Sequence, residues 1–244
     1  MSKLSDKIRR ATQVSPHALG FVTSRAAAES SMVLAGRARD AKGASEAAKR
    51  GADIVILGSR DSSASPGDAK DLGQTISGAW ISGKTDDEAA TYRDGGFDFV
   101  LFDPDRTAAT AVLDEGIGYV LSQPSDLTDL EVRALADFRL DAIYVGKIDA
   151  LTVRRQIELQ RIFGMTRKPL MADVSANTSV AEMRTLRDAN VVVVAVDGAD
   201  NVEKLRKTID ALPPRTRRRD DERPTPLVPT AAAAAGHDHD DDED

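Results

Sequence analysis

A short unit recurs along this chain. A stretch with helical periodicity ends at glycine or asparagine, and a run rich in Val, Ile and Phe follows directly, as in GADIVILGS from Gly51, GGFDFVLFDPD from Gly95 and NVVVVAVDG from Asn190. Glycine suits a helix C-terminus because it adopts a left-handed backbone at little steric cost. Continuous apolar runs are typical of parallel strands that are covered on both faces. The unit therefore predicts alternating strands and helices around a buried parallel sheet.

Helical patterns fill the segments between the apolar runs. Val202, Leu205, Ile209 and Leu212 recur with the spacing of one buried helix face. Three pairs have the spacing of a capping box directly after an expected strand: Thr85 with Glu88, Thr128 with Glu131, and Ser179 with Glu182. Each pair predicts the start of a helix. The chain therefore repeats a strand, a short loop, a capped helix and a glycine at which the helix ends, which we call the glycine stop.

The number of strands decides between two α/β architectures. We expect eight strands, at Met32–Ala35, Asp53–Leu57, Gly78–Ser82, Phe97–Phe102, Tyr119–Leu121, Ala142–Val145, Pro169–Ala172 and Val191–Val196. Eight βα units in about 200 residues predict a (β/α)8 barrel of the TIM type. An open doubly wound sheet is the alternative, but its usual glycine-rich first turn is missing from the sequence. A ninth apolar run, ALGFVT from Ala18, is an extra strand, a plug, or the first strand of a differently counted sheet.

The glycine stop before an apolar strand, as in AAKRGADIVILGS, resembles the small single-domain TIM barrels. That group includes sugar-phosphate epimerases, decarboxylases and class I aldolases. The resemblance covers about residues 31–212 and rests on organisation, at the level of the superfamily. It implies that any chemistry occurs at the carboxyl ends of the strands, where barrels of this type carry their active sites.

The chain divides into three parts. Residues 1–15 form an N-terminal arm, either a short helix or a loose segment, and residues 16–212 form the barrel. Residues 213–244 combine prolines, a basic run, five alanines and the ending HDHDDDED, with five Arg against nine Asp and Glu. Such a segment has too little apolar surface to offset its ordering entropy, so we expect a disordered tail.

Composition excludes several classes of function. The 244 residues include no cysteine, which rules out disulfides, zinc fingers, iron–sulfur ligation and thiol catalysis. The net charge of -7 argues against a nucleic-acid partner. No apolar run is long enough to span a membrane, and no signal-like start is present, so we expect a cytoplasmic protein. Catalysis by histidine, as in a Ser-His-Asp triad or a histidine-rich metal centre, is not expected, because His17 is the only histidine before the tail.

Lys147 is the first catalytic candidate. It follows the sixth expected strand, where several class I aldolases carry a Schiff-base lysine. Such a lysine needs a lowered pKa, which a neighbouring cation, Lys84 or Arg37, would provide, and Asp173 or Asp103 would then transfer protons. In the alternative interpretation Lys147 pairs with a nearby carboxylate at the barrel rim, which raises its pKa.

Three carboxylates at strand ends form the second candidate. Asp103, Asp173 and Asp197 would hold Mg²⁺ if they converged on the mouth, because Mg²⁺ prefers hard oxygen ligands. In the alternative, each caps a following helix or pairs with a cation. Mg²⁺ is the only cofactor that the sequence suggests.

Binding residues are expected at other strand ends. Arg37, Ser59, Ser175 and Asn177 are the candidates for contacting a small-molecule substrate. The long connection Ser59–Thr75 would overhang the mouth, as a lid or as a solvated insertion. The loops after the last two strands, DVSANTS and DGADN, carry aspartates that would repel an anion, so the usual phosphate site of TIM barrels is expected to be absent or modified.

Two classes of function remain open. In the first, the protein is a lyase or aldolase-like enzyme that acts on a small carbonyl or carboxylate metabolite at the barrel mouth. In the second, it is a barrel without catalysis that binds or assembles partners through its charged tail and outer helices. A homo-oligomer is compatible with both, and the tail would contact a protein partner in the second.

Overall fold

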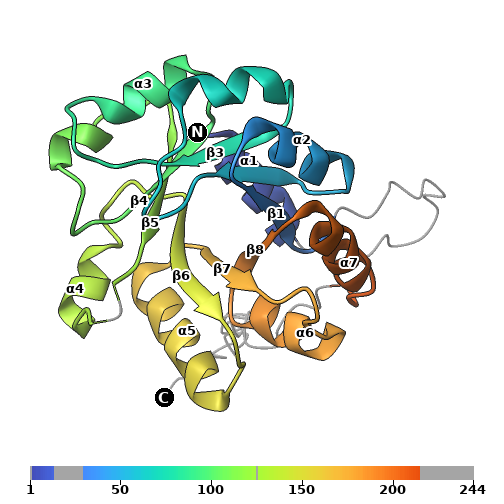
Figure 1. The fold of residues 1–244 in the computed structure, drawn as a ribbon. Helices are drawn as coiled ribbons and strands as arrows, with labels where there is room; N and C mark the ends of the chain where they lie inside the picture. The colour runs from blue at the N-terminus through green and yellow to red at the C-terminus, as the bar shows by residue number, and fades with distance from the viewer. Residues whose placement is uncertain (1, 14–29, 125, 215–244) are drawn as a thin grey trace, which may run out of the picture.

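Eight parallel strands close into a barrel in the computed structural model, which describes residues 2–13, 30–124 and 126–214 (Figure 1). Each strand pairs with its neighbours in chain order, and β1 closes the ring against β8. The strands are β1 Val33–Ala38, β2 Ile54–Leu57, β3 Ile76–Trp80, β4 Phe99–Phe102, β5 Gly118–Ser122, β6 Ala142–Ile148, β7 Leu170–Val174 and β8 Val191–Asp197. The expected TIM-type barrel is confirmed, and every expected strand overlaps an observed one.

Helices and short 3₁₀ segments connect the strands around the outside of the barrel (Figure 1). They are α2 Ala41–Lys49, η1 Pro66–Leu72, α3 Glu88–Asp94, η2 Ala109–Val112, α4 Asp129–Ala134, α5 Val153–Thr166, α6 Val180–Asp188 and α7 Ala199–Asp210. Capping boxes begin α4 at Thr128 and α6 at Ser179, as expected. None of the helices in the described part of the chain is both long and apolar enough to cross a membrane.

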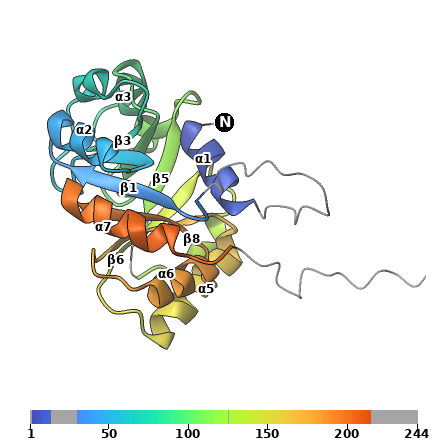
Figure 2. The same ribbon diagram turned by 90° about the vertical axis from the view of Figure 1, so that its right-hand side faces the viewer.

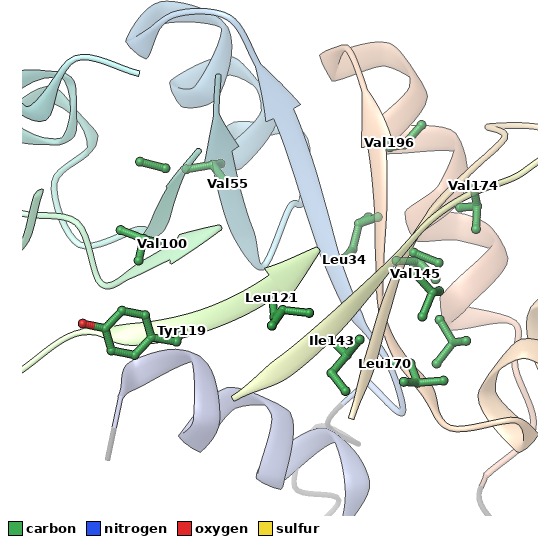
Figure 3. Packing of buried hydrophobic residues seen from close by; sticks show 14 of the residues in the cluster. Leu34, Val55, Val100, Tyr119, Leu121, Ile143, Val145, Leu170, Val174 and Val196 are labelled. Carbon is green, nitrogen blue, oxygen red and sulfur yellow. The ribbon is translucent and has the colours of Figure 1, made fainter. Parts of the chain in front are cut away.

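Alternate residues of each strand pack in two separate layers. One set faces outward against the helices, and Figure 3 shows part of it, including Leu34, Val100 and Ile143. The other set fills the barrel interior. It includes Ile56, Phe99 and apolar side chains from each of the other strands. Because both faces of the sheet are buried, the strands carry continuous apolar runs. The two layers together make the core.

The N-terminal segment forms a helix that closes the bottom of the barrel. Helix α1 (Lys3–Thr12) lies against β1, β5 and β8 (Figure 2). It buries Leu4, Ile8 and Ala11, which lie on one face, against the apolar interior. Lys3 pairs with Asp98 at 2.8 Å, and Lys7 with Asp53 at 2.9 Å. This part of the expected arm is therefore packed against the barrel.

The aspartate of the repeated glycine-stop unit has a structural role at this end. Asp53 directly precedes β2 and accepts a hydrogen bond from the backbone N–H of Leu34 at 2.9 Å. Asp98 precedes β4 and accepts one from Ser77 at 3.0 Å. Each carboxylate thus satisfies a backbone donor at the start of the neighbouring strand, and the same residues receive the lysines of α1.

Two local expectations need correction. Thr85 and Glu88 do not form a capping box, because α3 begins at Glu88 itself. The Glu88 carboxylate instead accepts hydrogen bonds from Ser82, Lys84 and Thr85 and stabilises the loop after β3.

The connection Ser59–Thr75 is not a lid over its whole length. Its second half forms η1, which buries Ala69 and Leu72 on the outside of the barrel.

Three further expectations fall outside the described residues. They concern the ALGFVT run from Ala18, His17, and the tail beyond Pro214.

Candidate active site at the barrel mouth

Three polar side chains meet where the barrel interior opens at the carboxyl ends of the strands. Arg37 near the end of β1 donates a hydrogen bond from Nη1 to Oδ2 of Asp173 on β7. The hydroxyl of Tyr144 on β6 donates to the same oxygen at 2.8 Å. Tyr144 packs edge-on against Trp80 of β3, with ring centroids 5.7 Å apart. The aromatic pair and the apolar interior beneath it hold Asp173 in a partly dry environment.

Two buried polar atoms of this cluster have no hydrogen-bond partner among the described residues. They are Oδ1 of Asp173 and Nε of Arg37. Nε lies 3.6 Å from the carboxylate of Asp197, which is beyond hydrogen-bond distance. Buried polar atoms are almost always paired in folded proteins, so an unpaired donor and an unpaired acceptor in one cluster indicate positions where a ligand or water completes the bonds.

Burial controls the titration of the cluster. Burial raises the pKa of Asp173 above its ordinary value, although the charge of Arg37 and the hydrogen bond from Tyr144 act in the opposite direction. Burial also raises the pKa of Tyr144, so its hydroxyl remains a donor at neutral pH. For Arg37, burial acts to lower the pKa, but Asp173, Tyr144 and Asp197 outweigh it, and the guanidinium stays charged. Asp173 is therefore the group of this cluster that is suited to exchange a proton.

A cavity of about 870 Å³ meets the cluster at Arg37; Asp173 and Tyr144 are not among its lining residues. Arg37, Arg39, Ser59 and Asp197 are among its lining residues, together with serines of the turn after β2 and the start of α7. Arg37 thus has one side on Asp173 and another on this cavity. Of the four binding candidates from the sequence, the structure brings Arg37 and Ser59 together here.

The turn Gly58–Ser63 forms one wall of the cavity. Gly58 has a positive φ of 81°, and a Cβ there would lie 2.6 Å from the carbonyl oxygen of Ser62, so the tight turn requires glycine. Arg60 donates a hydrogen bond from Nε to Oδ2 of Asp103 at 2.6 Å, and its Nη2 lies 2.5 Å from the same oxygen in an ion pair. Asp103 is buried, and this two-pronged ion pair holds the turn across the mouth.

Lys147 does not lie in the barrel interior. It belongs to β6, on which Ile143 and Val145 face the outer helices, and the register of β6 against β7 shifts between Tyr144 and Lys147. Its side chain is 65% exposed and pairs with Asp149 at 2.6 Å. The hydrogen bond and charge of Asp149 raise its pKa. A Schiff-base lysine needs a lowered pKa, so this geometry matches the alternative interpretation, a rim ion pair.

The three aspartates proposed as Mg²⁺ ligands do not fit a metal site. Asp103 is occupied by Arg60, Asp173 is occupied by Arg37, and Asp197 is largely exposed. Across the described residues, no group of three or more His, Cys, Asp or Glu side chains is arranged to hold a metal ion. The carboxylates are therefore neutralised by arginines of the chain itself.

The remaining candidates lie apart from the cluster. The Lys84 side chain is exposed in the loop after β3, where its backbone N–H bonds to Glu88. Ser175 and Asn177 line a separate cavity of about 200 Å³ with Glu182. The oxygen Oγ of Ser175 accepts the backbone N–H of Asn177 at 3.2 Å. These residues organise the turn before α6.

Tyr144 and Arg60 are site residues that were not among the candidates named from the sequence. Tyr144 belongs to the expected strand Ala142–Val145. Its position two residues after Ala142, which faces the interior, is the signal that would have placed its hydroxyl at the mouth. Arg60 carries no such signal, because its pairing with Asp103 depends on the path of an irregular turn.

Comparisons with known proteins show the fold alone. No family model matches the sequence, and no curated protein matches it. Among solved structures, KGPDC from Streptococcus mutans is 12% identical with a TM-score of 0.58, over 73% of this chain and 98% of that one. Thiamine phosphate pyrophosphorylase from Pyrococcus furiosus is 16% identical with a TM-score of 0.53, over 73% and 95%. The homocysteine methyltransferase MmuM from Escherichia coli is 11% identical with a TM-score of 0.52, over 72% and 95%. All three are enzymes by name.

Proposed function

We propose that this protein is a lyase or aldolase-like enzyme that acts on a small metabolite carrying a carbonyl and a carboxylate. The reaction takes place at the barrel mouth, with Asp173 as the proton-transferring group. One observation carries the proposal: Oδ1 of Asp173 and Nε of Arg37 are buried without a partner in one ion-paired cluster, and Arg37 also lines a cavity large enough for a metabolite. Both atoms then have a partner when substrate is bound.

The proposed step is the formation of an enolate. The ionised Oδ1 of Asp173 takes the proton from the carbon next to the substrate carbonyl. The electron pair of the broken C–H bond becomes the new C=C bond, and the carbonyl oxygen takes the negative charge. This intermediate is common to aldol chemistry and to decarboxylation beside a carbonyl.

Arg37 stabilises the charge that develops in this step. Its guanidinium is held by Asp173 on one side and lines the cavity on the other, so a substrate oxygen on the cavity side meets a fixed cation. A charge that is already oriented needs no reorganisation during the reaction. Tyr144 donates to Oδ2 of Asp173, and this hydrogen bond leaves Oδ1 as the basic oxygen.

The structural neighbours support an enzyme at the level of fold. KGPDC, thiamine phosphate pyrophosphorylase and homocysteine methyltransferase share the barrel at low sequence identity. One fold carries many reactions, so their activities supply no substrate for this chain. The alternative is a barrel without catalysis that binds or assembles partners through its charged tail and outer helices, and the tail lies outside the described residues from position 215 onward. We favour the enzyme because of the Arg37–Asp173–Tyr144 cluster at the mouth.

Deuterium exchange tests the proposed step directly. We expect the protein to exchange the C3 protons of pyruvate, 2-oxobutyrate or 2-oxoglutarate for deuterium in D₂O, as followed by loss of the proton NMR signal. Asp173→Asn should slow the exchange by about 10²–10⁴-fold, the range of a lost general base. Asp149→Asn is the matched control, because Asp149 pairs only with the exposed Lys147 among the described residues, and it should retain the rate. Equal rates in both variants, or no exchange above the protein-free rate, would contradict the proposal.

The pH profile of this exchange provides a second prediction. The base acts in its ionised form, so the rate should rise with pH through the pKa of Asp173. Burial raises that pKa, so the midpoint should lie above the value of about 3.9 for a free aspartate. The charge of Arg37 lowers the pKa, so Arg37→Met should move the midpoint to higher pH. A midpoint that does not move, in exchange rates measured from about pH 4 to about pH 9, would remove Asp173 from the role of base.

A further inference from the structure

A second cavity, of about 490 Å³, opens at the barrel mouth next to the first. The turn that contributes Ser59 to the first cavity contributes Arg60 to the second. The rest of its lining comes from the segments that follow β4 and β5, from the end of β6 and from α5. None of the residues of the Arg37–Asp173–Tyr144 cluster lines it. This cavity is therefore separate from the proposed reaction centre.

The charges around the second cavity are balanced. Its lining includes three cationic and three anionic side chains, namely Arg60, Lys147 and Arg155 with Asp105, Asp126 and Glu158. A phosphate or another polyanion would meet three carboxylates there, and a polyamine would meet three cations. In a ligand with one positive and one negative end, the positive end can pair with the carboxylates and the negative end with the cations. The lining therefore favours a zwitterion.

Gln123 adds a specific requirement for a hydrogen-bond donor. It lines the cavity, and its Oε1 is buried with no partner among the described residues. A buried acceptor without a donor is unfavourable, and a ligand N–H would satisfy it. An ammonium group supplies that donor together with a charge that suits Asp105 and Asp126.

Lys147 provides the complementary end. Arg155 is already engaged, with Glu158 at 2.7 Å and with the carbonyl oxygen of Val145 at 2.6 Å, and Arg60 is engaged with Asp103. The partner of Lys147 is Asp149, in an exposed ion pair of a kind that contributes little stability. Lys147 can therefore exchange Asp149 for a ligand carboxylate at small cost.

From these contacts we infer that the second cavity binds a free α-amino acid. The ammonium group donates to Oε1 of Gln123, and the carboxylate pairs with Lys147. The apolar lining residues Pro124, Val145 and Ile162 take an aliphatic side chain. This assignment gives Lys147 a binding role that needs a charged ammonium, in agreement with its exposed position, and it is independent of the chemistry proposed for Asp173.

Calorimetric titration of the full-length protein with L-leucine tests the inference. We expect saturable binding of L-leucine. N-acetyl-L-leucine, which lacks the ammonium group, and L-leucinamide, which lacks the carboxylate, should each bind at least about tenfold more weakly. Inorganic phosphate should not compete. No heat of binding for L-leucine, or equal affinity for the two blocked derivatives, would overturn the inference.

Variants assign the binding to this cavity. Lys147→Met and Gln123→Leu should each weaken L-leucine binding at least about tenfold. Lys84→Met is the matched control, because Lys84 is an exposed lysine that does not line the cavity, and it should bind as the unmodified protein does. Arg37→Met should also leave L-leucine binding unchanged, which separates this site from the reaction centre. Because Lys147 is exposed, its variant tests the site even if Gln123→Leu alters folding. Unchanged affinity in Lys147→Met would place the leucine elsewhere and overturn the inference.

Discussion

Replacing Phe99 by alanine is expected to lower the free energy of unfolding by about 3–5 kcal/mol, the range for truncating a buried phenylalanine. Phe99 lies on β4, is fully buried, and points into the barrel interior. It pairs in register with Gly78 of β3, where a Cβ would lie 2.2 Å from the Phe99 ring. The ring thus fills space that the neighbouring strand leaves empty, and alanine would leave a cavity that the closed barrel cannot easily collapse.

Urea denaturation followed by circular dichroism measures this loss. Phe138→Ala is the matched control, because Phe138 is 56% exposed, and its truncation should change stability by about 0.5 kcal/mol or less. If both truncations cost the same, the interior of the barrel would not be packed as the structure has it. Phe99→Leu keeps most of the apolar volume and should fall between the two.

The double truncation Leu4→Ala with Ile8→Ala is expected to destabilise the barrel by about 4 kcal/mol or more, since each buried residue alone is worth about 2–5 kcal/mol. Both side chains are buried, and both belong to the interior cluster although α1 precedes the barrel in the chain. Without them the bottom of the barrel is open to water. The two losses need not add, because the side chains are neighbours on one helix face.

The matched control removes the charges of the same helix and keeps its apolar face. Lys3 and Lys7 pair with Asp98 and Asp53 across the bottom of the barrel, and both lysines are partly or largely exposed. Lys3→Met with Lys7→Met should therefore cost no more than about 2 kcal/mol, at no more than about 1 kcal/mol per pair. Chemical denaturation ranks the two double variants. The opposite ranking would mean that α1 is held by charge and not by burial.

Much of the barrel could be predicted from local patterns. Continuous apolar runs located all eight strands, and Gly51 and Gly95 marked the ends of α2 and α3. Spacing alone was less reliable for helix starts: Thr128 and Ser179 begin helices as expected, whereas Glu88 has the same spacing from Thr85 and binds a loop instead. The loop was not foreseeable because its hydrogen bonds depend on the path of the chain after β3.

The sequence predicted where the candidate site lies, at the carboxyl ends of the strands, but it predicted only some of the residues that form it. Asp173 and Arg37 lie at strand ends as expected, on neighbours of β8, and their side chains meet across it. Lys147 also lies near the end of a strand, but it has the parity of Ile143 and Val145, which face the outer helices, and its side chain is 65% exposed at the rim. The end of a strand is therefore not sufficient to place a side chain in the mouth, because alternate residues face opposite sides of the sheet.

The repeated unit of apolar run and helix therefore determined, by itself, eight parallel strands that alternate with helices, because a strand buried on both faces must be apolar throughout. The closure of these strands into a ring, with β1 against β8, was settled only by the tertiary structure, since the strands of an open doubly wound sheet have the same composition. The tertiary structure decided which charges meet. Asp103 and Asp173 became arginine-paired carboxylates and not metal ligands, because Arg60 and Arg37 reach them from distant parts of the chain. It also decided that α1 closes the barrel. An amphipathic pattern predicts that one face of a helix will be buried, but the surface that buries it exists only in the assembled barrel.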